Sequence, residues 1–262
     1  MRVDLHLVSW NRPKMTELVI KTIWRNTKRE NFRLVVLDNG SDDETVTMLK
    51  RLEAEALIDE LILLKTNLGL EAARNCMFKN CTQSDYFICV DNDCLPPPML
   101  GTDWIEELIK LMEDWQDYAA ISCRTQVMIG TGNIFETADE MGEEIVDFPH
   151  PGGSLRIMRS KLVHFVKGWE RESPGRGAEE RYICGKLRDA GFKTAFAVQI
   201  QCLHLFGLRG ENPTDRWGYD IDLEPEDTGH SDIDHPALRN GDDLDEVAKY
   251  AGEELSYAYG RN

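Results

Sequence analysis

The sequence predicts an α/β fold in which helices flank a mainly parallel sheet. Short apolar runs without alternation, such as Phe32–Leu37 and Phe87–Val90, are typical of strands that are covered on both faces. Segments with helical spacing of their apolar residues lie between these runs. Strands that alternate with helices build right-handed β-α-β units, and such units assemble into a doubly wound sheet.

Length and composition set the limits of this fold. The chain has 262 residues, 42% of them hydrophobic, which is enough for one large α/β domain or two small ones. No run of about 18 apolar residues is present, so no transmembrane helix is predicted. Residues 1–4 lead directly into a strand, and we expect no signal peptide before it. The seven cysteines include no C-x-x-C pair, which predicts a reduced, cytoplasmic protein with buried thiols and argues against a zinc site.

Charge is unevenly distributed along the chain. The formal net charge of −17 argues against broad binding to nucleic acid or to anionic membranes. Residues 156–193 nevertheless hold ten lysines and arginines against five acids, a surface that suits a phosphorylated lipid, an anionic glycan or nucleic acid. Residues 211–262 hold 15 acids against four lysines and arginines. We expect an acidic, partly ordered C-terminal extension over 208–262, with a helical pattern at Asp243–Tyr257.

The first half of the chain is predicted to alternate four strands with three helices. The predicted strands are Val3–Ser9, Phe32–Leu37, Leu61–Leu64 and Phe87–Val90, and the predicted helices are Glu17–Trp24, Glu44–Ala56 and Glu71–Asn80. Each strand is followed by a polar loop, and these loops meet at the carboxyl edge of the sheet. In open α/β sheets that edge binds the ligand, so a nucleotide is expected there.

Two aspartates end the fourth strand in a D-x-D motif. Asp91 and Asp93 point the same way if the segment is extended, so both carboxylates reach one point. Oxygen ligands suit Mg2+ or Mn2+, which also take oxygens from a substrate phosphate. The alternative is a solvated turn in which one aspartate caps the next helix. Pro96–Pro98 should stop the strand from continuing.

The second half is less regular. We predict a helix at Trp104–Trp115, a strand at Tyr118–Cys123, an irregular segment over 124–150 and a turn at 149–153 before Ser154–Met158. Glu179 and Glu180 open a helix over Arg181–Ala190, and a late strand follows at Ile200–Phe206.

Several short motifs follow one another in a fixed order. They are Ser9–Pro13, Leu37–Thr45, Asn67–Gly69, Ala73–Asn75, Val90–Asp93, Gly152–Ser154, Gly168–Trp169, Glu179–Glu180 and Ala190–Phe192. In this order and spacing, residues 3 to about 207 resemble the family 2 glycosyltransferases, which have the GT-A fold. The resemblance implies one domain over 1–207, with a nucleotide-sugar half at about 1–98 and an acceptor half at about 99–207.

The resemblance implies a metal-dependent glycosyltransferase. Such an enzyme moves a sugar from a nucleotide diphosphate sugar, first of all a UDP-sugar, to a hydroxyl acceptor. The residues implied to bind the donor are Ser9, Asn11, Arg12, Asp38, Asn67, Arg74, Asp91, Asn92 and Gly153. Asp93, Asp91 and His204 are implied to bind Mn2+ or Mg2+.

Each implied role has a structural alternative. Asp38 would accept hydrogen bonds from the base or ribose, but an aspartate there also caps a loop. Arg74 would face the diphosphate or the sugar, or would lie on a helix surface. His204 would be a further metal ligand, or a buried structural histidine. For Gly153, near the sugar and the acceptor in the family, backbone geometry alone is the alternative.

The resemblance also implies a general base. The family pattern is Glu-Asp with the aspartate as base; here Glu180 takes the place of the aspartate and Glu179 that of the glutamate. A carboxylate can deprotonate an acceptor hydroxyl, although glutamate lengthens the arm. A second departure is Tyr182, where the family often has another acid. With Glu180 as base the anomeric configuration inverts, although related enzymes retain it. Alternatively, both acids simply suit the helix N-terminus.

Other functions stay open from the sequence. A nucleotidyltransferase-like enzyme would show a glycine-rich phosphate loop after the first strand, and Ser9–Pro13 has no such glycines. A non-catalytic module of the same fold would bind a glycan or partner without turnover. Sugar transfer onto modified nucleic acid would use the basic 156–193 surface and would depend strongly on salt. The expected acceptor is a glycan, a lipid-linked sugar met peripherally at a membrane, or another hydroxyl compound.

Overall fold

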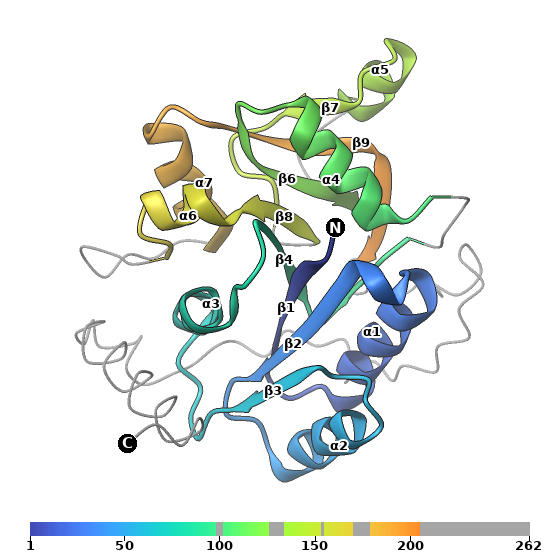
Figure 1. Ribbon diagram of the computed structural model, residues 1–262, viewed down its shortest axis with the longest axis vertical. Helices are drawn as coiled ribbons and strands as arrows, with labels where there is room; N and C mark the ends of the chain where they lie inside the picture. Colours follow the sequence, from blue (N-terminus) through green and yellow to red (C-terminus); the bar gives the residue numbers. More distant parts are fainter. Residues whose placement is uncertain (98–101, 126–133, 153–154, 170–178, 205–262) are drawn as a thin grey trace.

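The computed structural model describes residues 1–97, 102–125, 134–152, 155–169 and 179–204 (Figure 1). The strands are β1 (Val3–Ser9), β2 (Phe32–Asp38), β3 (Glu60–Leu63), β4 (Tyr86–Asp91), β5 (Cys94–Leu95), β6 (Tyr118–Thr125), β7 (Ile145–Asp147), β8 (Arg156–Arg159) and β9 (Lys193–His204). The helices are α1 (Pro13–Asn26), the short 3-10 helix η1 (Arg29–Asn31), α2 (Asp43–Ala54), α3 (Leu70–Cys81), α4 (Trp104–Asp114), α5 (Ile134–Glu140), α6 (Ser160–Phe165) and α7 (Glu179–Asp189).

The described strands form a continuous sheet in the order β3-β2-β1-β4-β8-β6-β9-β5, and β7 also pairs with β9. The first four strands of this order run parallel. β8 is antiparallel to both β4 and β6, whereas β6 and β9 are parallel. The parallel half is connected by helices, and this confirms the predicted α/β fold.

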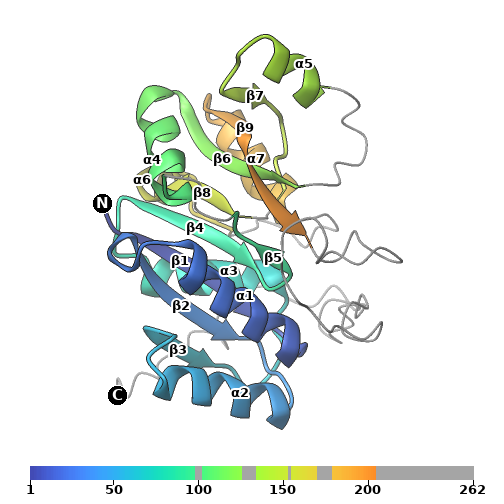
Figure 2. The same cartoon turned by 90° about the vertical axis from the view of Figure 1, so that its right-hand side faces the viewer.

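Helices cover both faces of the sheet (Figures 1 and 2). On one face, α1, α2 and α4 pack against side chains that include Ile88 and Val90. On the other face, α3, α6 and α7 pack against side chains that include Phe87 and Cys89. Consecutive residues of β4 therefore point into two different apolar layers. This is why the strand shows an unbroken apolar run rather than alternation.

The structure differs from the sequence predictions in three segments. The segment 124–150, predicted to be irregular, contains α5 and β7, which are short elements that contact β9. The late strand begins at Lys193 rather than Ile200, because β6 and β7 pair with its first residues. Residues Cys94 and Leu95 form an unpredicted strand, β5, before the prolines. Elements of two to seven residues depend on tertiary pairing, which periodicity does not detect.

Three further predictions concern the cysteines, the absence of a transmembrane helix and the C-terminal extension. The seven cysteines are free and buried, as predicted. Among the described helices, none has the length and apolar run that crossing a bilayer takes. The acidic extension over 208–262, with its helical pattern at Asp243–Tyr257, lies outside the described residues.

Asp4 joins the parallel strands at the edge opposite the polar loops. Its buried carboxylate accepts hydrogen bonds from Arg33 Nε at 2.8 Å, from the Gln83 backbone N–H at 2.7 Å and from the Ser84 backbone N–H at 2.9 Å. Burial acts to raise the pKa of Asp4, but the hydrogen bonds from Gln83 and Arg33 outweigh it and lower the pKa. The charged carboxylate therefore stabilises the fold at neutral pH, and this contribution is lost as the pH falls below the ordinary value of 3.8.

Replacing Asp4 by asparagine should lower the free energy of unfolding by about 2–4 kcal/mol, because the buried site loses the charged acceptor of the Arg33, Gln83 and Ser84 hydrogen bonds, although Arg33 keeps its ion pair with Glu60. The measurement is urea unfolding at pH 7. The matched control is Asp117→Asn, because Asp117 forms an exposed ion pair with Lys193 and its loss should change stability by at most about 1 kcal/mol. Equal effects of the two substitutions would contradict this account of Asp4.

Candidate active site

The candidate site lies at the carboxyl edge of the parallel strands. β1 lies between β2 and β4, and the register places Ser9 beside Asp38 and Val8 beside Asp91. The chain leaves β1 toward β2 on one side and later returns to β4 on the other. This point, where the strand order reverses, is where open α/β sheets bind their ligands.

The loop after β1 is held in an unusual backbone conformation. Asn11 and Arg12 both have positive φ angles, 51° and 59°, which for non-glycine residues cost of order 1 kcal/mol each. The Asn11 N–H donates to Ser41 Oγ at 2.8 Å, and Asn11 Oδ1 accepts from the Asp42 N–H at 3.1 Å. These two bonds tie the loop to the loop after β2. Ser9 is fully buried, with its Oγ 3.4 Å from Thr16 Oγ1.

Asp38 lies beneath the second loop. Its side chain is fully buried, and its two oxygens accept from the hydroxyl and the backbone N–H of Ser41. Burial raises the pKa of Asp38, while the bonds from Ser41 lower it in part. In this structure Asp38 therefore organises the loop, as in the capping alternative. A contact with the nucleotide would use a remaining lone pair of the carboxylate.

Asn67 joins the third loop to the second. Its Oδ1 accepts from Asn39 Nδ2 and from the Gly69 N–H, both at 2.8 Å, and Asn39 Oδ1 accepts from the Leu68 N–H at 2.9 Å. Gly40 makes this approach possible, because a Cβ there would lie 2.4 Å from the backbone of Thr66. The Asn39–Asn67 pair thus fixes two loops of the site against each other.

Arg74 lies in neither of the two places expected from the sequence, which were the donor site and the helix surface. It lies neither on the helix surface nor in the open site, because its side chain is only 1% exposed. Its guanidinium donates to His6 O at 2.8 Å, to Val90 O at 3.3 Å and to Asp91 Oδ1 at 2.5 Å. The ion pair holds Asp91, whose side chain is 28% exposed, at the end of β4.

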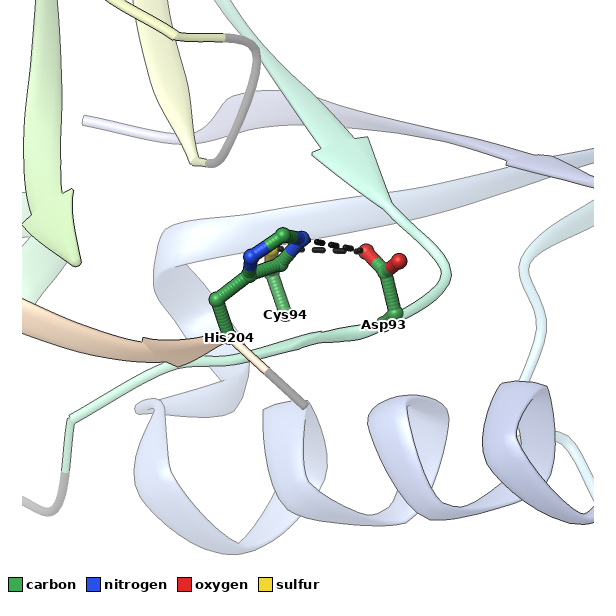
Figure 3. Close-up of side chains that lie close together, drawn as sticks. All are labelled: Asp93, Cys94 and His204. Carbon is green, nitrogen blue, oxygen red and sulfur yellow. Dashed lines mark hydrogen bonds and ion pairs between the residues drawn. The ribbon is translucent and has the colours of Figure 1, made fainter. Parts of the chain in front are cut away.

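Asp93 and His204 meet at the other side of the same turn (Figure 3). β5 follows Asp93 directly and pairs with the end of β9, so that Cys94 lies opposite His204. His204 Nε2 lies 3.4 Å from Asp93 Oδ1, and Arg12 lies 3.5 Å from Asp93 Oδ2. Burial acts against charge on both residues, but their mutual contact lowers the pKa of Asp93 and raises that of His204.

A divalent cation fits this arrangement. The ligand atoms of Asp93, Cys94 and His204 lie within 4.8 Å of one another, so a single ion can reach all three. Asp91, predicted as a further ligand, is not part of this cluster, and its Oδ1 is engaged by Arg74. Asn92 donates to Thr16 Oγ1 at 3.2 Å, and Gly153 lies outside the described residues.

The two glutamates of α7 have different surroundings. Glu179 is buried, and its Oε1 accepts from Arg156 at 2.6 Å and from the indole N–H of Trp169. Glu180 is half-buried, and burial is the main cause that raises its pKa. The charges of Glu179 and Asp91 raise that pKa further, and Arg156 opposes them. A carboxyl with a raised pKa is a stronger base near neutral pH.

Sequence reasoning missed several residues that shape the site. Cys94 joins the metal-ligand cluster, Arg156 and Trp169 hold Glu179, and Asn39 holds Asn67. Cys94 stands directly beside the D-x-D motif, and this adjacency was the available signal. The roles of Arg156 and Trp169 depend on contacts between distant segments, which the sequence pattern does not reveal.

Comparisons with known proteins agree with this architecture. The family model described as glycosyl transferase family 2 matches residues 5–164, more than half of the chain. A search of curated proteins found no match. The solved structure of the mannosyltransferase PcManGT from Pyrobaculum calidifontis, in complex with GDP-Man and Mn2+, is similar with a TM-score of 0.62 and 18% identity. That match covers 100% of this chain and 76% of PcManGT.

Two further solved structures show the same likeness. TarS 1-349 of S. aureus has a TM-score of 0.59 at 14% identity, over 98% of this chain and 66% of TarS 1-349. GalNAc-T7, solved with UDP, GalNAc and Mn2+, has a TM-score of 0.65 at 14% identity, over 97% of this chain and 55% of GalNAc-T7. At these identities the likeness shows the fold, which is that of the GT-A glycosyltransferases.

Neutralising Glu179 and neutralising Glu180 should have different effects on the stability of the fold. Glu179→Gln should lower the free energy of unfolding by about 3 kcal/mol, because it leaves the buried charge of Arg156 without a partner. Glu180→Gln should not lower the free energy of unfolding at pH 7. The raised pKa of Glu180 means that folding disfavours the ionised carboxylate, which the glutamine removes. Urea unfolding of both variants measures the difference. An equal loss in both would contradict the different surroundings described for the two residues.

Proposed function

Because the chain belongs to glycosyl transferase family 2, we propose that it transfers a sugar from a nucleotide diphosphate sugar to a hydroxyl acceptor with the aid of a divalent metal ion. The observation that carries this proposal is the meeting of Asp93 and His204, 3.4 Å apart, beside Arg12 at the carboxyl edge of β1 and β4. A metal ligand pair beside a permanent cation suits a diphosphate.

We infer that the donor is a UDP-sugar, with a GDP-sugar as the alternative to be compared. The structures of GalNAc-T7 with UDP and Mn2+ and of PcManGT with GDP-Man and Mn2+ support a nucleotide donor and Mn2+, with Mg2+ as the alternative ion. The loops that carry Asn11, Asp38 and Asn67 are bonded to one another and would form the wall for the base and ribose. Arg12 would neutralise diphosphate charge.

Asp93 and His204 would hold the metal ion. When bound, the ion would stabilise the negative charge that develops on the departing nucleoside diphosphate. Asp91 is fixed by Arg74 through one oxygen, and its part-exposed carboxylate would accept hydrogen bonds from a sugar or ribose hydroxyl. In this assignment Arg74 acts through Asp91 and does not touch the donor.

Glu180 would be the general base. As the acceptor oxygen attacks the anomeric carbon, its proton passes to the Glu180 carboxylate. The bond from that carbon to the diphosphate oxygen breaks, and the electron pair leaves with the nucleoside diphosphate. A single displacement of this kind inverts the anomeric configuration. Glu179, bonded to Arg156 and Trp169, would position the first turn of α7 rather than take a proton.

The acceptor is proposed by chemical class alone. A hydroxyl on a glycan, on a lipid-linked sugar or on another compound would satisfy the geometry of a base beside the donor edge. Glu180 opens α7 in the half of the chain that follows β4, so we assign the acceptor to that half.

The donor half of the proposal is tested by a binding screen. Purified protein with Mn2+ or Mg2+ is titrated with UDP-sugars, GDP-sugars and other nucleotide sugars by calorimetry. We expect metal-dependent binding of one nucleotide class that Asp93→Ala weakens at least tenfold. The control Asp114→Ala removes an exposed carboxylate on α4 and should bind as the wild type does. Failure of the folded wild type to bind any nucleotide sugar with either ion would sink the proposal.

The role of Glu180 is tested by the pH dependence of transfer. Glu180→Gln should lower kcat by about 10²–10⁴ while donor affinity stays unchanged, because a general base contributes that much. In the wild type kcat/KM should fall as the pH drops through the raised pKa of Glu180, since protonation removes the base. Glu180→Asp should recover part of the rate. A fully active Glu180→Gln enzyme would exclude this base.

A further inference from the structure

Three different ligand chemistries meet at the turn after β4. Asp93 offers a carboxylate oxygen, Cys94 a sulfur and His204 an imidazole nitrogen, and Figure 3 shows the three side chains directed toward one another. Asp93 Oδ1 lies 3.6 Å from Cys94 Sγ and 3.4 Å from His204 Nε2. The same Asp93 oxygen thus contacts both the sulfur and the nitrogen.

These distances are those of a small tetrahedral coordination sphere. Bonds of about 2.0–2.3 Å at tetrahedral angles place two ligand atoms roughly 3.3–3.7 Å apart. The oxygen–sulfur and oxygen–nitrogen separations fall inside that range. The sulfur and the nitrogen lie within 4.8 Å of each other, so the three ligand atoms surround one point.

The exposure of the three groups leaves one side open. Cys94 is fully buried and forms the inner wall, whereas the side chains of Asp93 and His204 are 13% and 28% exposed. Three protein ligands on one side and an open position on the other are typical of catalytic zinc sites, which bind water or substrate at the fourth position. A diphosphate oxygen of the donor would take that position.

The backbone holds the sulfur in place. Cys94 lies opposite His204 in the β5–β9 ladder, so the two side chains leave the same face of adjacent strands. Cys202, two residues before His204, also points to that face, and its sulfur lies close enough to Cys94 to share a hydrogen bond. Cys202 Sγ itself donates to the Arg124 carbonyl oxygen at 3.5 Å, which fixes the orientation of this neighbouring thiol.

We propose that Cys94 is a third protein ligand of the metal site and that the site takes Zn2+ or Co2+ ahead of Mg2+. On binding, the Cys94 thiol would release its proton to solvent and the thiolate would form the metal–sulfur bond. Sulfur and imidazole ligands favour Zn2+ and its analogues, whereas Mg2+ prefers oxygen alone. This proposal rests on the proposed function only in that the same ion would face the donor diphosphate.

Cobalt spectroscopy tests the proposal without any turnover. Full-length protein freed of metal by a chelator is titrated with Co2+ under reducing, oxygen-free conditions. We expect one Co2+ per chain, intense visible bands of a tetrahedral ion and a near-ultraviolet charge-transfer band from thiolate to cobalt. The charge-transfer band should vanish in Cys94→Ser and persist in Cys76→Ser, a buried thiol on α3 that lies in a different apolar cluster. It should also persist in Cys202→Ser, and Zn2+ should displace the Co2+.

Two results would overturn the proposal that Cys94 binds the metal ion. Weak visible bands with no charge-transfer band in the wild type would overturn the proposal, and this result does not depend on whether any variant folds. A band that survives in a folded Cys94→Ser variant would assign the thiolate elsewhere and overturn it too. Nucleotide-sugar binding with Mn2+, measured on the same samples, separates the two proposals: if binding persists while the thiolate band is absent, the sulfur ligand alone is wrong.

Discussion

The two-residue pairing of β5 with β9 is the constraint on which the candidate site depends. It brings Cys94 opposite His204, and with Cys94 comes Asp93, which would otherwise end a free turn. The short ladder is supported because β9 is itself paired with β6 and β7 over 193–197 and again with β6 at Gln201 and Cys202. β9, a strand of twelve residues, thus places His204 beside β5, which directly follows the D-x-D motif at the end of β4.

In each pair of acidic residues, a buried arginine forms an ion pair with one carboxylate and not with the other. Arg74 holds Asp91 and leaves Asp93 to the metal ligand cluster, while Arg156 holds Glu179 and leaves Glu180 half-buried beside it. A buried ion pair contributes little net stability, but removing one partner is costly. The locked acid of each pair therefore fixes the backbone from which its neighbour acts. In both places a buried arginine holds one acid and does not hold the acid next to it or two residues away.

The sequence predicted the parallel half of the fold well, and the reasons are local, whereas the roles of the site residues stay predictions. Apolar runs, helix spacing and polar loops at strand ends depend on neighbouring residues, so β1, β2 and β4 were predicted within one residue of their bounds at most ends. Burial of charged groups depends on distant packing, so the interior position of Arg74 was not predicted, whereas the capping of the loop by Asp38, which needs only nearby Ser41, was one of the alternatives. The absence of C-x-x-C argued against zinc from spacing rules, which describe ligands close in the chain, and that expectation stays a prediction. Cys94 and His204 are brought together by strand pairing instead.

The separation of those two residues along the chain has a consequence for folding. β1, β2 and β3 pair with partners about 25–30 residues apart and β1 pairs with β4 across 83 residues, whereas the β5–β9 ladder closes a loop of about 110 residues, which is slower still. During synthesis, the first 98 residues would leave the ribosome and pair before the histidine strand exists. The meeting of Asp93, Cys94 and His204 would then be among the last events of folding, after the second half of the chain is in place.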